Sequence, residues 1–325
     1  MKISILDLVH VNKDSTPQEA LHCSLKLAQK AEEFGYHRFW VAEHHNMPSI
    51  ASAATSVVIA YLAGGTKTIR VGAGGIMLPN HSPLVIAEQF GTLETLYPGR
   101  IDLGLGRAPG TDQRTLRALR RDPMSSQSFP QDVQELAAYF DEVKEGQMIQ
   151  AVPGGGLHLP LWILGSSTFG AHLAASLGLP YAFASHFAPD ALMDALDIYR
   201  REFRPSKQLQ RPYVMMGINV IAADTDKEAR YHFTSLQQAF TNLHRGYRGG
   251  FLPPIEDIDS YWSPQEKILA SHMLSYSIVG TRETLKRGLI SIMEKTKVDE
   301  LMVVGSIYDL DARIKSFQLL AEAIN

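Results

Sequence analysis

The sequence predicts an α/β fold, a single (β/α)8 barrel over residues 1–325, on two observations. Short apolar runs alternate along the chain with longer segments of helical periodicity, the pattern of a parallel sheet whose strands are joined by helices. Eight such units in 325 residues, 45% of them hydrophobic, are typical of a closed barrel with one large core. A doubly wound open sheet is the competing prediction, because strand order cannot be read from one sequence.

The predicted strands are short runs of apolar residues bounded by glycine, proline or polar residues. The run from Val71 to Leu78 is apolar on both faces, as expected for a strand covered by helices. Its glycines weaken a strand, so they indicate a close approach of a ligand or an unusual backbone shape. In chain order the predicted strands span residues 3–9, 38–42, 68–78, 101–105, 161–164, 181–184, 213–222 and 300–304.

Capping residues and apolar spacing place the helices between these strands. Thr16-Pro17 opens the first helix and Gly35 ends it, while Ser82 is a suitable N-cap with Pro83 at the first helical position. The predicted helices span residues 16–35, 49–63, 82–97, 112–121, 129–145, 169–177, 190–203, 226–243, 281–295 and 310–324.

Residues 246–263, GYRGGFLPPIEDIDSYWS, form an insertion that does not fit the alternation of strands and helices. Long segments of this kind in a compact domain are usually functional or disordered. As a lid near the C-terminal end, the segment would bring Phe251, Tyr261 or Trp262 over the barrel mouth. A surface loop or a subunit contact is an equally good interpretation.

Composition excludes several classes of protein. The formal net charge of −3 and the lack of a long basic run give no support for nucleic-acid binding. Cys23 is the single cysteine, so no internal disulfide can form, and a cytoplasmic location fits best. No stretch is long and apolar enough to span a membrane or to act as a signal peptide.

Two successive strands end in glycine-rich loops, at Gly74-Gly75 and around Arg107. In a parallel α/β protein ligands bind at the carboxyl ends of strands, and an arginine suits a phosphate group. Tight turns alone would explain one such loop. Two adjacent loops favour a phosphate-bearing cofactor that lies across the strand ends.

Ser166, Ser167 and Thr168 precede a predicted helix and extend this phosphate site. Hydroxyl groups and free amide groups at a helix start favour a dianion, although N-capping would explain one of the serines. The glycine spacing around Arg107 is not the dinucleotide fingerprint, because its third glycine is one position late. Gly165-Ser-Ser also lacks the spacing of a nucleophile elbow.

His44 and His45 follow the second predicted strand, directly after Glu43. Because adjacent strand residues point to opposite faces, only one of the two histidines can face the barrel mouth. This argues against a metal site built from both. One histidine there could act as a general base, but a loop histidine held by backbone is the better interpretation of these residues alone.

Several of these motifs resemble one known family. Residues 74–107, GGIMLPNHSPLVIAEQFGTLETLYPGRIDLGLGR, are similar to the matching part of the bacterial luciferase-like flavin monooxygenases. Glu43-His44-His45, Gly165-Ser-Ser-Thr168 and Leu177-Gly-Leu-Pro180 also fit that family, in order and over essentially the whole chain. The resemblance implies a luciferase-like TIM barrel that uses reduced FMN (FMNH2) and dioxygen.

The resemblance also implies roles for single residues. His44 matches the catalytic histidine, with Glu43 as a neighbour that orients or charges the site. Gly74-Gly75 matches a non-prolyl cis peptide under the flavin ring, for which a β-bulge is the alternative. Arg107 and Ser167 are the best-matched phosphate ligands, and the other implied cofactor-binding residues are Ser166, Thr168 and Gly170.

The predicted function is therefore an FMN-dependent monooxygenase that acts on a small organic substrate, such as an aldehyde or another carbonyl compound. No nicotinamide fingerprint is present, so a separate flavin reductase is expected to supply FMNH2. Helices 49–63 and 82–97 match the dimer-forming helices of the family and imply a homodimer. A deazaflavin (F420)-dependent oxidoreductase, a metal-dependent hydrolase and a non-catalytic flavin-binding protein remain the alternatives.

Overall fold

The computed structural model describes residues 1–108, 112–122 and 124–324, and its centre is a closed barrel of parallel strands. Eight strands pair in the ring order β1-β2-β3-β4-β5-β6-β7-β9, and β9 pairs again with β1. The predicted (β/α)8 barrel is thus confirmed. Including a ninth strand outside the ring, the strands are β1 Lys2–Asp7, β2 Arg38–Val41, β3 Arg70–Met77, β4 Ile101–Gly106, β5 Leu161–Gly165, β6 Tyr181–Phe183, β7 Val214–Ala222, β8 Ser277–Gly280 and β9 Glu300–Val304.

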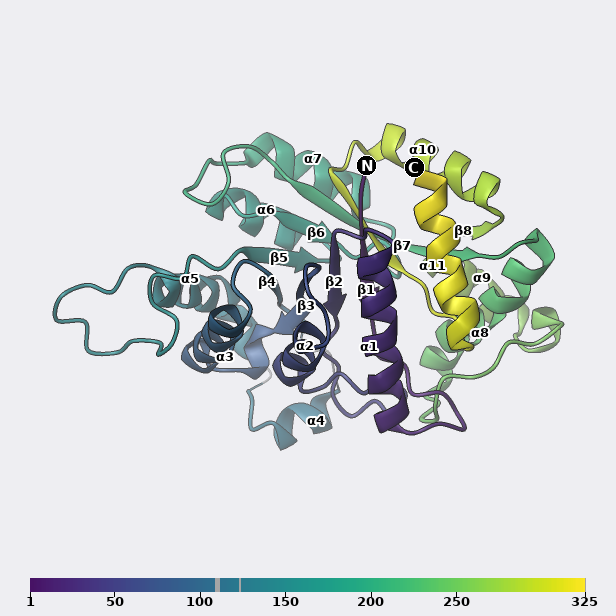
Figure 1. Ribbon diagram of the computed structural model, residues 1–325, viewed down its shortest axis with the longest axis horizontal. Coiled ribbons are helices and arrows are strands. Elements are labelled where there is room, and N and C mark those ends of the chain that lie inside the picture. The colour runs from purple at the N-terminus through teal and green to yellow at the C-terminus, as the bar shows by residue number, and fades with distance from the viewer. Residues whose placement is uncertain (109–111, 123, 325) are drawn as a thin grey trace.

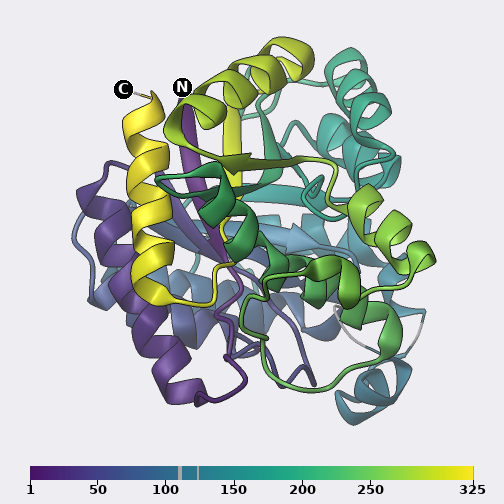
Figure 2. The same cartoon turned by 90° about the vertical axis from the view of Figure 1, so that its right-hand side faces the viewer.

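Helices surround the barrel, and the two chain ends lie near each other at one end of it (Figures 1 and 2). The apolar faces of the helices pack on the outer side of the strands, where most of the buried side chains lie. The helices are α1 Pro17–Glu33, α2 Thr55–Gly64, α3 Pro83–Leu96, α4 Gln113–Ala118, α5 Phe129–Phe140, α6 Thr168–Leu177, α7 Leu192–Glu202, α8 Asp226–Arg245, α9 Pro264–Met273, α10 Arg282–Thr296 and α11 Leu310–Ile324. Within the described ranges, no helix combines the length and apolar character needed to cross a membrane.

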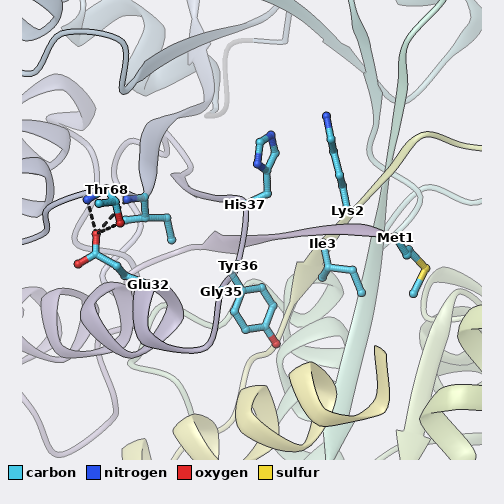
Figure 3. A pocket seen from close by; sticks show the side chains of 9 residues that line it. Met1, Lys2, Ile3, Glu32, Gly35, Tyr36, His37 and Thr68 are labelled. Carbon is cyan, nitrogen blue, oxygen red and sulfur yellow. Dashed lines mark hydrogen bonds between the residues drawn. The ribbon is translucent and has the colours of Figure 1, made fainter. Parts of the chain in front are cut away.

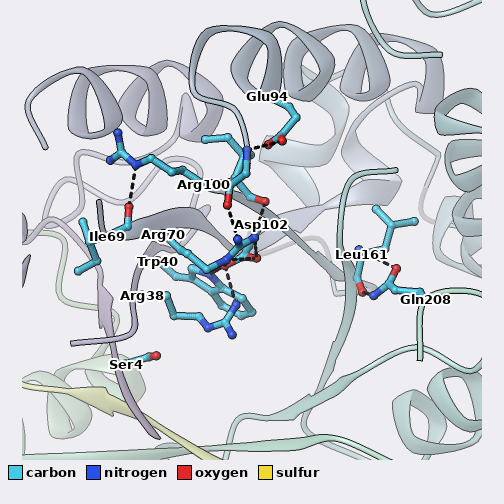
Figure 4. Close-up of polar contacts among 12 residues, drawn as sticks. Ser4, Arg38, Trp40, Ile69, Arg70, Glu94, Arg100, Asp102, Leu161 and Gln208 are labelled. Carbon is cyan, nitrogen blue, oxygen red and sulfur yellow. Dashed lines mark hydrogen bonds and ion pairs between the residues drawn. The ribbon is translucent and has the colours of Figure 1, made fainter. Parts of the chain in front are cut away.

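A buried charge network closes the barrel at the amino ends of its strands (Figure 4). Arg38 on β2 donates from Nη1 to Asp102 on β4 at 2.7 Å and from Nε to Glu300 on β9 at 2.8 Å. Arg70 on β3 also reaches Asp102, from Nη2 at 2.6 Å. Above this layer, Trp40, with Leu6, Ala42, Trp162, Ala182, Met215, Met302 and Val304, fills the barrel interior. Among the described residues, side chains thus fill the amino end of the barrel, and a cavity opens at the carboxyl ends of the strands.

A shallow hollow of about 410 Å³ lies outside the barrel at the same amino end (Figure 3). One wall is a structural contact, in which Glu32 accepts hydrogen bonds from the backbone amides of Lys67, Thr68 and Ile69. Burial opposes ionisation of Glu32, but these backbone bonds outweigh it and lower its pKa to about 2. The Glu32 contact holds α1 to the start of β3, and none of the predicted site residues lines the hollow.

Two elements lie outside the predicted pattern. The sequence analysis assigned no structure to residues 264–280, where the structure has α9 and β8. Only Ala270 of α9 is fully buried, so the helix shows no apolar period that would predict it. The four-residue β8 pairs with the carboxyl half of β7, outside the closed ring.

Several predicted helices are shorter in the structure, α2 and α5 by the most residues. Residues 49–54 belong not to α2 but to a loop, in which Ala51 donates its amide to the Val9 carbonyl and Ile50 forms a bridge with His10. Helix α5 ends at Phe140 rather than at 145, because Asp141 takes an extended backbone conformation before a charged stretch. The error at 49–54 comes from an apolar run and the error at 141–145 from a charged run, and each run is compatible with either a helix or a loop.

Candidate active site

A cavity of about 520 Å³ opens at the carboxyl ends of the barrel strands. Most of the predicted site residues meet in its wall, although they come from β2, β3, β4, β5 and the loops that follow them. The predicted residues that line the cavity are His44, Gly74, Gly75, Arg107, Ser166, Ser167 and Gly170. Glu43 and Thr168, which the sequence analysis also placed in the site, are not part of the lining.

Gly74 and Gly75 form a bare stretch of backbone at the end of β3, and the peptide bond between them is cis. A Cβ on Gly74 would lie 2.7 Å from Leu6 Cδ1, and one on Gly75 would lie 2.7 Å from the Gly104 carbonyl oxygen. Neither position has room for a side chain. The pairing of β3 with β4 also shifts register here, so the alternative of a β-bulge holds as well. Both glycines line the cavity, so backbone without side chains faces a ligand here.

Arg107 and the start of α6 form a second part of the cavity wall. The guanidinium of Arg107 lies 4.0 Å from the centre of the Phe169 ring, in the first turn of α6. Ser167 occupies the N-cap position, but its hydroxyl makes no capping hydrogen bond. Simple N-capping therefore does not explain this serine. A cation, exposed hydroxyls and the unpaired first amides of a helix form a suitable cradle for a phosphate group.

His44 and His45 point to different sides, as the alternation of strand residues predicts. His44 lines the cavity, whereas Nε2 of His45 lies 2.7 Å from Glu43 Oε1. His81 contacts the same carboxylate oxygen at 2.8 Å, and the Met77 amide donates to Glu43 Oε2 at 3.0 Å. Glu43 therefore joins the end of β2 to the end of β3 and holds the loop that carries His44. The structure places it as a positioning residue rather than beside a ligand.

The Glu43 carboxylate is ionised at all ordinary pH values. Burial alone would raise its pKa, but hydrogen bonds from His45, His81 and the Met77 amide outweigh burial and lower the pKa to about 2. The ligand atoms of Glu43, His45 and His81 lie within 4.8 Å of one another, close enough to hold a metal ion. Since the donors around the carboxylate already satisfy it, hydrogen bonding explains the cluster without an ion.

Replacing Glu43 with glutamine is expected to destabilise the protein by about 1–3 kcal/mol near neutral pH, because the amide leaves donors unsatisfied. The folded-state pKa of about 2 lies below the ordinary value of 4.5, so this stabilisation is complete above pH 5–6 and declines as the pH falls toward 2. Urea unfolding of wild type and Glu43→Gln at several pH values checks this, with the exposed Glu33→Gln as control. A constant difference between pH 6 and pH 3 would contradict it.

Two further histidines line the cavity and were missed by the sequence analysis: His10 and His186. His10 follows β1, lies 3.1 Å from Ser306 Oγ through Nε2, and stacks on Phe251 with ring centres 4.5 Å apart. Burial lowers the pKa of His10 to about 4, helped by the charge of Arg313. The sequence offers little to mark His10 as a site residue, because many strands are followed by a single histidine that binds no ligand.

The insertion at 246–263 covers one side of the cavity, which supports its interpretation as a lid. Phe251 pairs with the loop after β1, donating its amide to the Val11 carbonyl and accepting from the Lys13 amide. Of the three predicted aromatic residues, only Phe251 reaches the cavity. Trp262 packs with α8 and α9, and the Tyr261 hydroxyl donates to Asn242 Oδ1 at 2.9 Å.

A barrel whose upper end combines a bare glycine floor, a phosphate cradle and a histidine suits a phosphorylated, flat cofactor. The sequence profile of the luciferase-like monooxygenase family matches residues 1–300 of the chain. The chain belongs to this family. The resemblance seen in the sequence motifs is thus confirmed, and with it an oxidoreductase of the monooxygenase class.

Relatives of the family cover nearly the whole chain. A luciferase-like monooxygenase of Escherichia coli strain K12 is 56% identical over 317 residues, which are 97% of this chain and 95% of the relative. The crystal structure of apo-MsnO8 is 35% identical, covers 99% of this chain and 98% of its own, and superposes with a TM-score of 0.92. The fold of nearly the whole chain is therefore shared with apo-MsnO8.

More distant structures share only the fold. The oxygenating constituent of 3,6-diketocamphane monooxygenase from Pseudomonas putida, solved in complex with FMN, is 17% identical with a TM-score of 0.74 and covers 100% of this chain and 97% of its own. An F420-dependent secondary alcohol dehydrogenase is 16% identical with a TM-score of 0.71 and covers 100% and 99%. Family and fold thus leave two cofactor classes to distinguish.

Proposed function

We propose that the protein is a monooxygenase that uses reduced FMN and dioxygen to oxidise a small organic substrate, such as an aldehyde or another carbonyl compound. One observation carries the proposal: the bare Gly74-Gly75 backbone and the cradle at Arg107 belong to the same cavity. The first suits a flat ring and the second a terminal phosphate. FMN combines these two groups, and bound reduced flavin supplies the electrons for oxygen activation.

In this proposal some cavity residues bind the cofactor and one transfers protons. Arg107, Ser166, Ser167 and the first amides of α6 hold the phosphate, and Gly74-Gly75 supports the ring. His44, on the cavity wall, accepts or donates a proton at the substrate. The apolar side chains of α8 and the segment at 246–263 exclude water, which protects a reactive oxygen species from side reactions.

Labelled oxygen tests the reaction class. The protein is mixed with FMNH2, a panel of aldehydes and ketones, and ¹⁸O2, and the products are analysed by mass spectrometry. We expect one ¹⁸O atom in the product of at least one substrate, with loss of that product in His44→Ala. Oxidation of reduced F420 with no reaction of FMNH2 would favour the deazaflavin-dependent alternative, for which the F420-dependent fold relative is the supporting observation. A separate flavin reductase is expected to sustain turnover.

A homodimer is the second part of the proposal. Helices α2 and α3 expose large apolar side chains at their outer faces, namely Val57, Tyr61, Val85 and Leu96. Ser56 on α2 donates to Gln89 on α3 at 2.8 Å, so the two helices form one continuous surface. Apolar side chains grouped on neighbouring helices are typical of a subunit interface.

Replacing Val57 with arginine is expected to convert a dimer to a monomer, because it places a charge in the middle of the apolar surface of α2 and α3. Val57 is 68% exposed in the single chain, so the variant should fold normally. Size-exclusion chromatography with light scattering measures the mass of each form. Ile290→Arg, at a half-exposed position of α10, is the matched control and should leave the mass unchanged. A wild-type monomer would refute the homodimer.

A further inference from the structure

An imidazole without a hydrogen-bond partner lies in the cavity wall at the end of β6. His186 follows β6, and its Nδ1 atom is buried with no hydrogen-bond partner. No hydrogen bond to either ring nitrogen is formed within the part of the chain that the structure describes. A polar atom in this state is uncommon in a folded protein and points to a ligand.

The position of this imidazole is built by three neighbouring residues. Gly217 on β7 faces the barrel interior, and a Cβ there would lie 2.3 Å from His186 Nδ1. The ring therefore occupies the space that any side chain at 217 would fill. Asn219, two residues further along β7, donates from Nδ2 to the His186 carbonyl at 2.7 Å. The Ser185 hydroxyl donates to the Gly217 carbonyl at 2.6 Å. Hydrogen bonds therefore fix the backbone of both His186 and Gly217 where the imidazole packs on the glycine.

The cavity around His186 carries little charge. Burial, together with a smaller effect of the nearby His44, lowers the pKa of His186 to about 4, so the ring is neutral at pH 7. Among the described residues that line the cavity there is no aspartate, glutamate or lysine, and Arg107 lies against Phe169 of α6. The remaining wall near the lid is largely apolar and includes Leu236, Phe240, Leu243 and Phe251, with His10 and Asn242 among its polar members.

We propose that His186 is the polar anchor of the substrate part of the cavity and that it selects an uncharged, largely apolar ligand with one oxygen over an anionic one. A neutral imidazole offers one donor and one acceptor, which suffices for a carbonyl or hydroxyl oxygen. A carboxylate would lose its hydration without gaining a cation, which is costly. The inference rests on the proposed function in one respect, because it takes this ligand to be the substrate.

Calorimetric titration of the full-length protein with three matched probes tests the proposal: 2-octanone, octanoate and octane. The variants are His186→Leu, which removes the polar group, and Gly217→Ala, which displaces the ring but keeps it. His22→Leu, at an exposed position of α1 outside the cavity lining, is the control. Each protein is titrated with and without FMN. Anaerobic titration with FMNH2 is measured separately.

Wild type is expected to bind 2-octanone more tightly than octanoate, and both cavity variants should weaken 2-octanone binding by about three- to tenfold. Octane binding should not weaken in His186→Leu, since only an apolar contact is involved. Equal affinity of wild type and both variants for 2-octanone, or a preference for octanoate, would overturn the proposal. Failure of FMNH2 to bind, with the ketone result intact, would instead refute the flavin assignment alone.

Discussion

Replacing Arg38 with alanine is expected to lower the free energy of unfolding by about 3–5 kcal/mol, the largest change in stability that we predict. The guanidinium lies between Asp102 and Glu300 at the closed end of the barrel, and all three side chains are buried. Its loss leaves two carboxylates without their main counter-charge. Burial alone would raise the pKa of Asp102, but Arg38 and Arg70 hold it below the ordinary value, so the variant also gains a carboxyl that resists ionisation.

Guanidinium chloride unfolding at pH 7 measures this change. Lys26→Ala is the control, since it breaks the exposed ion pair with Asp311 and should cost less than about 1 kcal/mol. If Arg38→Ala does not fold, Arg38→Lys should give an intermediate loss, because a lysine keeps the charge but not the two-sided geometry. A loss below 1 kcal/mol in Arg38→Ala would show that the network does not hold the barrel closed.

Replacing Arg107 with alanine is expected to weaken FMNH2 binding by about 10- to 100-fold, the size of a lost charged hydrogen bond to phosphate. The side chain is exposed at the cavity mouth and, among the residues that the structure describes, packs against the Phe169 ring. Its removal should therefore leave the fold intact. Anaerobic titration monitored by the quenching of protein fluorescence gives the dissociation constants.

Reduced riboflavin is the matched control for Arg107, because it carries the same ring without the phosphate. Its affinity should be equal in wild type and in Arg107→Ala, and Arg107→Lys should recover only part of the FMNH2 affinity. Raising the salt concentration should reduce the gap between FMNH2 and riboflavin in wild type. An equal loss for both ligands would mean that Arg107 shapes the ring site and does not bind the phosphate.

The ring of barrel strands could be predicted from the sequence because each strand is a local feature. Buried parallel strands are continuous apolar runs, and all eight runs are strands of the barrel. The short β8 could not be predicted, because four residues are too few to show a periodic pattern. The preceding helix α9 has only one buried residue, so it also lacks a clear apolar face. The network of Arg38, Asp102 and Glu300 joins residues up to 262 positions apart, and no local pattern indicates such a pairing.

The site could be predicted as far as it depends on residues that directly follow strands. Adjacent residues of a strand point to opposite sides, which correctly predicted that His44 and His45 would separate. The same rule does not identify the contacts on the second side, so the hydrogen bonds of Glu43 with His45 and His81 were not predicted. His186 became visible only through its contact with Gly217 on another strand.

Anaerobic titration of the purified protein with FMNH2, beside reduced F420, tests the central claim most directly. We predict saturable binding of FMNH2 at micromolar concentration and weaker or no binding of reduced F420. When the FMNH2 complex is mixed with aerated buffer, we predict rapid oxygen consumption. Tight binding of reduced F420 without FMNH2 binding, and no reaction with oxygen, would contradict the assignment of a flavin monooxygenase.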